Sequence, residues 1–206
     1  MNAVEALHAF GVSTVYEAAG QQGLVDMPLI RLVPDSRAAG PARTVLCGQD
    51  DNVMVHAVME RARPGEVLVL TMPEPRAISL VGDILALQAH RRGVAGVLVD
   101  AACRDVDQLR ELGLPIWCRY VRSTAATKTS PGQLDVPVTV GGARIAPGDL
   151  VVMDGDGAVV VPAARLDAVL AAAAAREERE DALRDRLLEG ELTYDVHGLR
   201  RVVEGG

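Results

Sequence analysis

Residues 93–105 read GVAGVLVDAACRD, and this stretch decides the fold. Its first part, 94–100, is an apolar run without polar alternation, which is typical of a strand buried on both faces of a parallel sheet. The small residues 101–103 predict a turn after this strand, and Arg104 and Asp105 follow in the same loop. Ligands bind at the carboxyl ends of strands in open α/β sheets, so this loop is a candidate ligand site.

The flanking segments extend this strand into a repeating pattern. Residues 66–70 (EVLVL) predict an earlier buried strand, and the spacing of apolar residues over 80–92 predicts a helix between the two strands. A short helix over 106–112 and a strand over 114–119 follow. This order predicts a βαβαβ core with parallel strands.

The two ends of the chain show different patterns. Residues 135–162 consist of short β-type runs separated by Gly-Gly, Pro-Gly and Asp-Gly turns, which predict antiparallel hairpins. The DGDG at 154–157 lacks the spacing and closing glutamate of a calcium loop, so it is interpreted as a hairpin turn. Residues 2–20 predict two short helices. The alanine-rich residues 163–189 predict a long helix, whose charged stretch indicates a solvated face when it is taken alone.

Composition excludes several classes of function. A chain of 206 residues with 49% hydrophobic residues can bury one sizeable core, so we expect a single domain over 1–206. A net charge of -7 and an aromatic content of 2% argue against a nucleic-acid partner. No signal peptide and no apolar window of roughly 18 residues is found, so no membrane partner is expected. Three cysteines without a CxxC pair fit free thiols in the cytoplasm.

Two short motifs carry candidate chemistry. The planar guanidinium of Arg104 can donate hydrogen bonds to a carboxylate or ketone oxygen, while Asp105 can bind Mg²⁺ or Mn²⁺ directly or through water. Gly82 and Asp83 stand at the expected start of a helix, where free N–H groups can bind an anion. Structural roles are equally open: the Arg-Asp pair fits a helix cap, and Asp83 fits an N-cap.

Six segments of the sequence together match one known protein family, although no single segment would identify it: STVYEAAGQQG, GPARTVLCGQDDNVMVHAVMERARPGEVLVL, GDILALQAHRRGVAGVLVDAACRD, GLPIWCR, TKTSPGQLDVPVTVGGARIAPGDLVVMDGDGAVVVP and GELTYDVHGLRRVVE. With these segments the chain resembles the RraA-like family from Thr14 to Arg200. Within that family it is similar to the aldolases of 4-hydroxy-4-methyl-2-oxoglutarate and 4-carboxy-4-hydroxy-2-oxoadipate. The resemblance implies an α/β fold, a swivelling-domain-like β/β/α sandwich with a long C-terminal helix. It also implies a homotrimer or a dimer of trimers, in which residues 163–206 pack on a neighbouring subunit.

The resemblance further implies the activity of a divalent-metal-dependent aldolase, which cleaves a 4-hydroxy-2-oxo diacid to pyruvate and a second 2-oxo acid. The same enzymes often decarboxylate oxaloacetate. Both reactions leave an enolate beside the former ketone, and a cation together with an arginine can stabilise that charge, so one site can perform both.

Site residues follow from the resemblance position by position. Arg104 would bind substrate as a catalytic residue, and Asp105 would hold Mg²⁺ or Mn²⁺. The pyruvate carboxylate would be bound by the backbone of four residues: Gly82, Asp83, Ile84 and Leu85. Asp83 would also lie near a metal-bound water and take part in catalysis. An acidic residue from the neighbouring subunit's long helix would reach the metal through water, with Glu180 the first choice and Glu177 the second.

The chain departs from the family pattern at two places. The family commonly has Asp-Gly-Gly-x-Arg-Asp, whereas Ala101 and Ala102 replace the two glycines here. If either position needs a positive φ, this loop must adjust its backbone. Tyr120 and Arg122 replace small residues and would add bulk and charge near the rim of the site. We therefore expect these departures to affect the choice of substrate.

Two alternatives to a metal-dependent aldolase stay open. One is an aldolase that uses Lys128, the only lysine, to form a Schiff base, although its Thr/Ser/Ala-rich loop offers no predicted apolar pocket. The other is a non-catalytic regulatory or binding protein of the RraA type. His56 is interpreted as structural, and His197 as a surface or cap residue.

Overall fold

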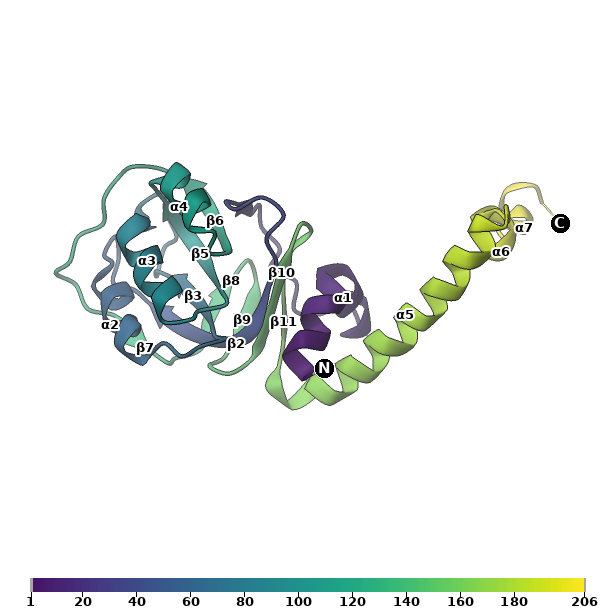
Figure 1. Cartoon of the computed structure of the whole chain (residues 1–206), viewed down its shortest axis with the longest axis horizontal. Helices are drawn as coiled ribbons and strands as arrows, with labels where there is room; N and C mark the ends of the chain where they lie inside the picture. The colour runs from purple at the N-terminus through teal and green to yellow at the C-terminus, as the bar shows by residue number, and fades with distance from the viewer. Residues whose placement is uncertain (1, 206) are drawn as a thin grey trace.

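The computed structural model describes residues 2–205, and the middle of its main sheet is built from parallel strands (Figure 1). Four strands lie side by side in this order: β2 (Ala38–Leu46), β3 (Val67–Thr71), β5 (Gly96–Cys103) and β6 (Ile116–Val121). Each neighbouring pair is parallel. The predicted βαβαβ core is thereby confirmed.

Helices cover one face of these strands. Leu68 and Leu70 of β3 are fully buried against this layer, because alternate residues of a strand point to the same face. The layer consists of three helices: α2 (Val53–Arg61), α3 (Asp83–Arg91) and α4 (Val106–Leu112). Figure 1 shows them together on the side of the sheet away from α1.

The other face is covered by a small β-hairpin. Val67 and Val69 alternate with the leucines of β3 and pack in a second core with β8 (Val138–Val140) and β9 (Ala143–Ile145). The layers are therefore hairpin, sheet and helices. This confirms the expected α/β class and its β/β/α sandwich.

An antiparallel half extends the sheet beyond β2. Strand β10 (Leu150–Asp154) pairs with β11 (Gly157–Val161) and with the first residues of β2, so β2 joins the two halves. The predicted hairpin turn at 154–157 is confirmed, since Asp154 pairs with Gly157. Two short strands complete the sheet: β1 (Ile30–Arg31) pairs with β6, and β7 (Gln133–Leu134) pairs with β2.

Two predicted boundaries near residues 80–103 are wrong. The helix expected over 80–92 begins only at Asp83, because the buried residues before it form β4 (Ser79–Val81), which pairs with the end of β5. The turn expected at 101–103 is strand as well. This end of β5 pairs with β4 on one side and β6 on the other, and its small side chains are completely buried, so the loop begins at Arg104.

Helices from both ends of the chain pack on the antiparallel half. Helix α1 (Ala3–Ala18) is broken at Gly11, whose φ of 78° is left-handed, which confirms two short helices. A single turn, η1 (Ala163–Arg165), leads into α5 (Leu166–Leu188), which then projects away from the body (Figure 1). Two short helices follow it: α6 (Thr193–Val196) and α7 (Arg200–Val203). Packing of this tail on a neighbouring subunit stays a prediction. Over residues 2–205, no helix combines the length and apolar character needed to cross a membrane.

A close backbone contact in β2 gives a test of this sheet. A Cβ at Gly40 would lie 2.0 Å from the carbonyl oxygen of Gly65, so Gly40→Ala must displace backbone. We expect a loss of about 1–3 kcal/mol in the free energy of unfolding, measured with urea. The control is Gly155→Ala in the 154–157 turn, where the nearest atom lies 3.5 Å away on a flexible arginine. Equal stability of the two variants would contradict this packing.

Candidate active site at the ends of β4 and β5

The turn between β4 and α3 lies directly against the loop after β5. Val81 pairs with Cys103, and the Arg104 N–H donates to the Val81 carbonyl oxygen at 3.0 Å. A Cβ at Gly82 would lie 2.4 Å from Asp105 Oδ2 and 3.1 Å from Arg104 Nε. Only glycine therefore fits at position 82 while these neighbours stay in place.

Asp105 turns its carboxylate toward this glycine rather than toward its own helix. Its backbone is left-handed, with φ 59° and ψ 42°, a conformation that aspartate tolerates better than most residues. The side chain makes no capping hydrogen bond to α4. Instead Oδ2 accepts the Asp83 N–H at 3.2 Å and lies 3.4 Å from Arg104 Nε. Asp105 thus occupies the N-cap position of α4 with its backbone, while its side chain accepts the first N–H of α3, so the helix-cap interpretation holds in a different form from the expected one.

The start of α3 offers backbone donors. Gly82 occupies the N-cap position and has no side chain, so the N-cap interpretation of Asp83 is also wrong. Asp83 is the first residue of the helix and gives its N–H to Asp105. Ile84 and Leu85 follow at positions whose N–H groups have no partner within a helix. These groups, together with the helix dipole, can bind a carboxylate.

A cavity of about 200 Å³ opens at this turn. Its lining comes from the beginning of α2, the β4–α3 turn, the loop after β5 and the loop after β6: Asn52, His56, Ser79, Gly82, Asp83, Ile84, Leu85, Arg104, Ala125, Ala126 and Lys128. All residues predicted to bind substrate thus meet in one cavity. Asp105 lies beside it, behind Gly82.

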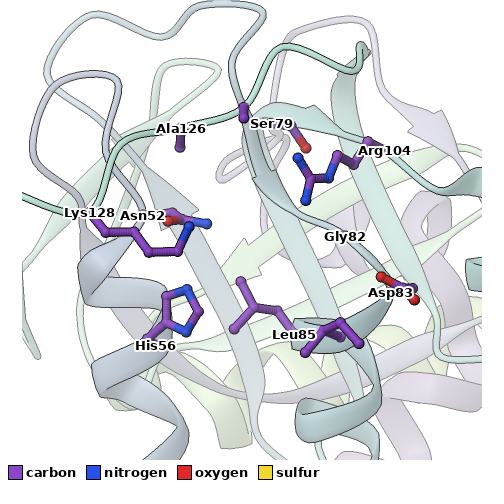
Figure 2. A pocket seen from close by; sticks show the side chains of 11 residues that line it. Asn52, His56, Ser79, Gly82, Asp83, Leu85, Arg104, Ala126 and Lys128 are labelled. Atoms are coloured by element: carbon purple, nitrogen blue, oxygen red, sulfur yellow. The ribbon is translucent and has the colours of Figure 1, made fainter.

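Two cationic side chains enter this cavity from opposite sides. Figure 2 shows the Arg104 guanidinium and the Lys128 amine pointing toward one another, while His56 lies below Lys128. Apolar groups of Leu85 and Ala126 share the lining with Lys128. Lys128 itself is exposed, so the expectation that no apolar pocket encloses it holds, but the loop after β6 folds back over α2 and brings the lysine to this cavity. The arrangement suits a ligand with two negative groups.

His56 also belongs to this cavity, so interpreting it as merely structural is incomplete. Partial desolvation lowers the pKa of its imidazole, and the positive charge of Lys128 lowers this pKa further. Both effects favour the neutral imidazole, which can accept a proton. His197 lies in the tail, outside the residues that line the cavity.

Asn52 presents an unpartnered oxygen at the same place. Its Nδ2 donates to the Leu80 carbonyl oxygen at 3.1 Å, and this fixes the orientation of the amide because a carbonyl can only accept. The other amide atom, Oδ1, is buried and has no hydrogen-bond partner within residues 2–205. Unsatisfied buried acceptors are rare, and here the atom belongs to a residue that lines the cavity.

Asp51 anchors the loop that carries Lys128. This carboxylate is fully buried and accepts hydrogen bonds from the Thr127 hydroxyl and from the N–H groups of Val53, Thr129 and Ser130. Burial alone would raise the pKa of Asp51, but these hydrogen bonds outweigh it and hold the pKa well below its usual range. Its contribution to stability is therefore fully present above about pH 4 and is lost only in stronger acid.

The donor set fits a divalent cation of the magnesium type. Over residues 2–205, no group of three acidic, histidine or cysteine side chains gathers as a closed metal site. Mg²⁺ does not need one, since it commonly binds one or two carboxylates, water and oxygens of its substrate. Asp105 is 34% exposed, and its Oδ1 makes no hydrogen bond within the described chain. Asp105 with Asp83 nearby is thus compatible with such a cation.

The acidic residues of α5 lie elsewhere in this chain. Helix α5 runs on the side of the sheet opposite α3 (Figure 1), so neither Glu177 nor Glu180 approaches the cavity of its own subunit. Glu180 contacts Arg176 at 2.8 Å and Arg184 at 3.2 Å. A role at a neighbouring subunit's metal stays a prediction, and it would require Glu180 to loosen these ion pairs.

The two departures from the family pattern leave the cavity intact. Ala101 and Ala102 lie within β5 and have no positive φ, so alanine fits without adjustment of the backbone. Tyr120 and Arg122 are not among the residues that line the cavity. Arg122 donates to the Val121 carbonyl oxygen instead. Both residues lie beside the end of β5, since the Arg122 N–H donates to the Cys103 carbonyl oxygen at 3.0 Å, so their effect on the rim stays a prediction.

The coupling between Lys128 and His56 is directly testable. Lys128→Met removes the positive charge that disfavours protonation of His56, so the pKa of His56 should rise. This pKa is measured by following the imidazole proton shifts with pH in NMR spectra, with His56→Gln used to assign the signal. Arg144→Met, outside the cavity, should leave the pKa unchanged. An unchanged value in Lys128→Met would contradict the placement of the lysine.

Comparisons with known proteins identify the family of the chain. The family model described as RraA-like, Aldolase/RraA, matches residues 12–160. A relative from Halalkalibacterium halodurans, provisionally named 4-hydroxy-4-methyl-2-oxoglutarate aldolase, is 37% identical over 154 residues. The alignment covers 75% of this chain and 73% of that protein.

Solved structures show the same fold. An uncharacterized protein from Pseudomonas syringae pv. tomato has a TM-score of 0.82 and 26% identity, over 92% of this chain and 94% of its own. RraAS2 of Streptomyces coelicolor, described as an unusual member of the RNase ES inhibitor RraA protein family, has a TM-score of 0.74 and 32% identity. That match covers 88% of this chain and 95% of the other. The family model and the 37% identical relative together show that the chain belongs to the RraA-like, Aldolase/RraA family.

Proposed function

We propose that this protein is a divalent-metal-dependent aldolase that cleaves a 4-hydroxy-2-oxo diacid to pyruvate and a second 2-oxo acid. Oxaloacetate, also a 2-oxo diacid, would lose carbon dioxide at the same site. The observation that carries this proposal is the meeting of Arg104, Lys128 and the start of α3 around one cavity of about 200 Å³. The name of the Halalkalibacterium relative supports the aldolase reaction.

The substrate would be held at both ends. The N–H groups at Ile84 and Leu85 would bind the carboxylate next to the ketone, as a helix N-terminus favours. The second carboxylate would face Lys128, on the opposite side of the cavity from Arg104. Among the residues that line the cavity only Asp83 is acidic, so the surroundings favour a dianion.

Bond cleavage places negative charge on the ketone oxygen. When the bond between C3 and C4 breaks, its electron pair moves toward C2 and the oxygen gains charge as an enolate. Arg104 would donate hydrogen bonds to this oxygen, and such bonds strengthen as charge develops. Loss of carbon dioxide from oxaloacetate produces the same charge distribution, so the same groups serve both reactions.

The aldol cleavage also needs a proton acceptor for the 4-hydroxyl. Two lining groups can serve: the Asp83 carboxylate through a water molecule, and the neutral imidazole of His56. Decarboxylation of oxaloacetate needs no such acceptor. Loss of aldol cleavage with retained decarboxylation, in Asp83→Asn or in His56→Gln, therefore identifies the base.

A metal ion completes the proposed site. A divalent cation held by Asp105 would supply positive charge that stabilises the developing negative charge on the substrate. Asp105 is already fixed by the Asp83 N–H, so its free oxygen is oriented before a cation arrives. We include in the proposal a homotrimer or hexamer, in which Glu180 or Glu177 of a neighbouring copy reaches this cation through water.

The test measures pyruvate release from oxaloacetate and from 4-hydroxy-4-methyl-2-oxoglutarate with Mg²⁺ or Mn²⁺. We expect turnover that EDTA abolishes, and Asp105→Asn should lower kcat/KM on the order of 100-fold or more. The matched control is Asp107→Asn on α4, whose carboxylate is 89% exposed and should be dispensable. Turnover that survives both EDTA and Asp105→Asn would reject the role given to Asp105.

Two other functions have an observation in their favour. Lys128 lies in the cavity, which permits a Schiff base with the ketone; borohydride with pyruvate would then leave a covalent adduct on Lys128, and none is expected here. The RNase ES inhibitor family of RraAS2 suggests a regulatory binding protein. That function predicts a stable protein partner and no turnover on either substrate.

A further inference from the structure

The position of Lys128 depends on one buried carboxylate outside the cavity lining. Asp51 Oδ2 accepts three hydrogen bonds from the loop after β6: the Thr127 hydroxyl at 2.6 Å, the Thr129 N–H at 2.6 Å and the Ser130 N–H at 3.0 Å. Its Oδ1 accepts the Val53 N–H at 2.8 Å, at the start of α2. Asp51 therefore ties the loop to the helix on which His56 lies.

Backbone hydrogen bonds reinforce this attachment on one side of the lysine. The Asn52 N–H donates to the Thr127 carbonyl oxygen at 3.0 Å, and the Thr127 N–H donates to the Asp50 carbonyl oxygen at 2.9 Å. On the other side of Lys128, the attachment found in the described chain is through Asp51. Both neighbours of Lys128 in the sequence are thus fixed, and its side chain projects into the cavity (Figure 2).

We propose that Asp51 is a positioning residue, which places the Lys128 ammonium to receive the second carboxylate of a 2-oxo diacid. This inference rests on the proposed function. In this inference, the attachment through Asp51 selects dicarboxylic substrates. Arg104 and the start of α3 bind the ketone and its adjacent carboxylate, which all 2-oxo acids share. Asp51 touches no substrate and acts only through Lys128.

The chemistry of this attachment requires a carboxylate. Both oxygens of Asp51 accept from N–H groups, which lie on opposite sides: Val53 in α2, and Thr129 and Ser130 in the loop. An asparagine amide has one oxygen and one NH₂ group, so in either orientation its NH₂ group faces a backbone N–H donor and one hydrogen bond is lost. Asp51→Asn should therefore release the loop from α2 while changing the volume of the side chain very little.

The experiment compares Asp51→Asn with wild type by two readouts. The first is the pKa of His56 measured by NMR, which Lys128 lowers only while it stays close. The second readout compares the KM for oxaloacetate with the inhibition constant of pyruvate, because pyruvate has no second carboxylate. Because a misplacement of about 1 Å can cost on the order of 100-fold, we expect the KM for oxaloacetate to rise by about that factor. The inhibition constant of pyruvate should stay unchanged.

Matched variants separate positioning from general stability. Asp149 is also a nearly buried carboxylate that accepts two N–H groups, from Ala146 at 2.8 Å and Ala163 at 3.0 Å, but it neither lines the cavity nor binds the loop that carries Lys128. Asp149→Asn should destabilise the protein and leave both readouts at wild-type values. If Asp51→Asn does not fold, Thr127→Val removes only the hydroxyl donor and should shift both readouts in the same direction by a smaller amount.

The outcomes are distinct. A raised His56 pKa together with a raised KM for oxaloacetate supports the inference. An unchanged pKa and KM in folded Asp51→Asn, or equal changes in KM and pyruvate inhibition, overturn it. If wild type turns over neither oxaloacetate nor 4-hydroxy-4-methyl-2-oxoglutarate, the proposed function fails. In that case a raised His56 pKa in Asp51→Asn still supports placement of Lys128 by Asp51.

Discussion

The candidate site depends on the close approach of Gly82 to Asp105. With the Asp105 carboxylate only 2.4 Å from the position of a Cβ, any larger residue at 82 would displace this carboxylate from the start of α3. The contact places the free N–H groups of α3 beside Arg104, because the Asp105 carboxylate accepts the first N–H of that helix. One small residue and one carboxylate therefore assemble an anion site, a guanidinium and a candidate metal ligand at a single edge of the sheet.

Much of this arrangement could be predicted because its signals are local. The apolar run before Arg104 identified a buried strand, and parallel strands bring their carboxyl ends to one edge. The predicted boundaries of the helix and the turn are wrong where the sequence pattern fits two kinds of structure. Leu80 and Val81 fit a helix as well as a strand, and only the pairing of Val81 with Cys103 decides between them. The small residues at 101–103 suggested a turn, but they belong to β5, and their side chains are completely buried on the faces of the sheet.

Sequence reasoning did not find Asn52, and it did not bring His56 and Lys128 together on the other wall of the cavity. Asn52 and His56 belong to α2, whereas Lys128 comes from a loop more than seventy residues later. Their meeting depends on a buried carboxylate, Asp51, and the sequence does not distinguish it from Asp50 beside it, which is only partly buried. The one available signal was the occurrence of a single lysine in an arginine-rich chain. Hydrogen bonds across such separations have no periodic pattern, so only the folded structure reveals them.

The central claim is that a divalent cation and a 2-oxo acid meet between Asp105 and Arg104. The most direct measurement is the relaxation of the pyruvate methyl protons in the presence of Mn²⁺ and the protein, because a paramagnetic ion shortens relaxation only at short range. The account predicts strong enhancement with wild type and Asp107→Asn, and its loss in Asp105→Asn and in Arg104→Met. Equal enhancement in all four proteins, or none in wild type, would contradict the claim.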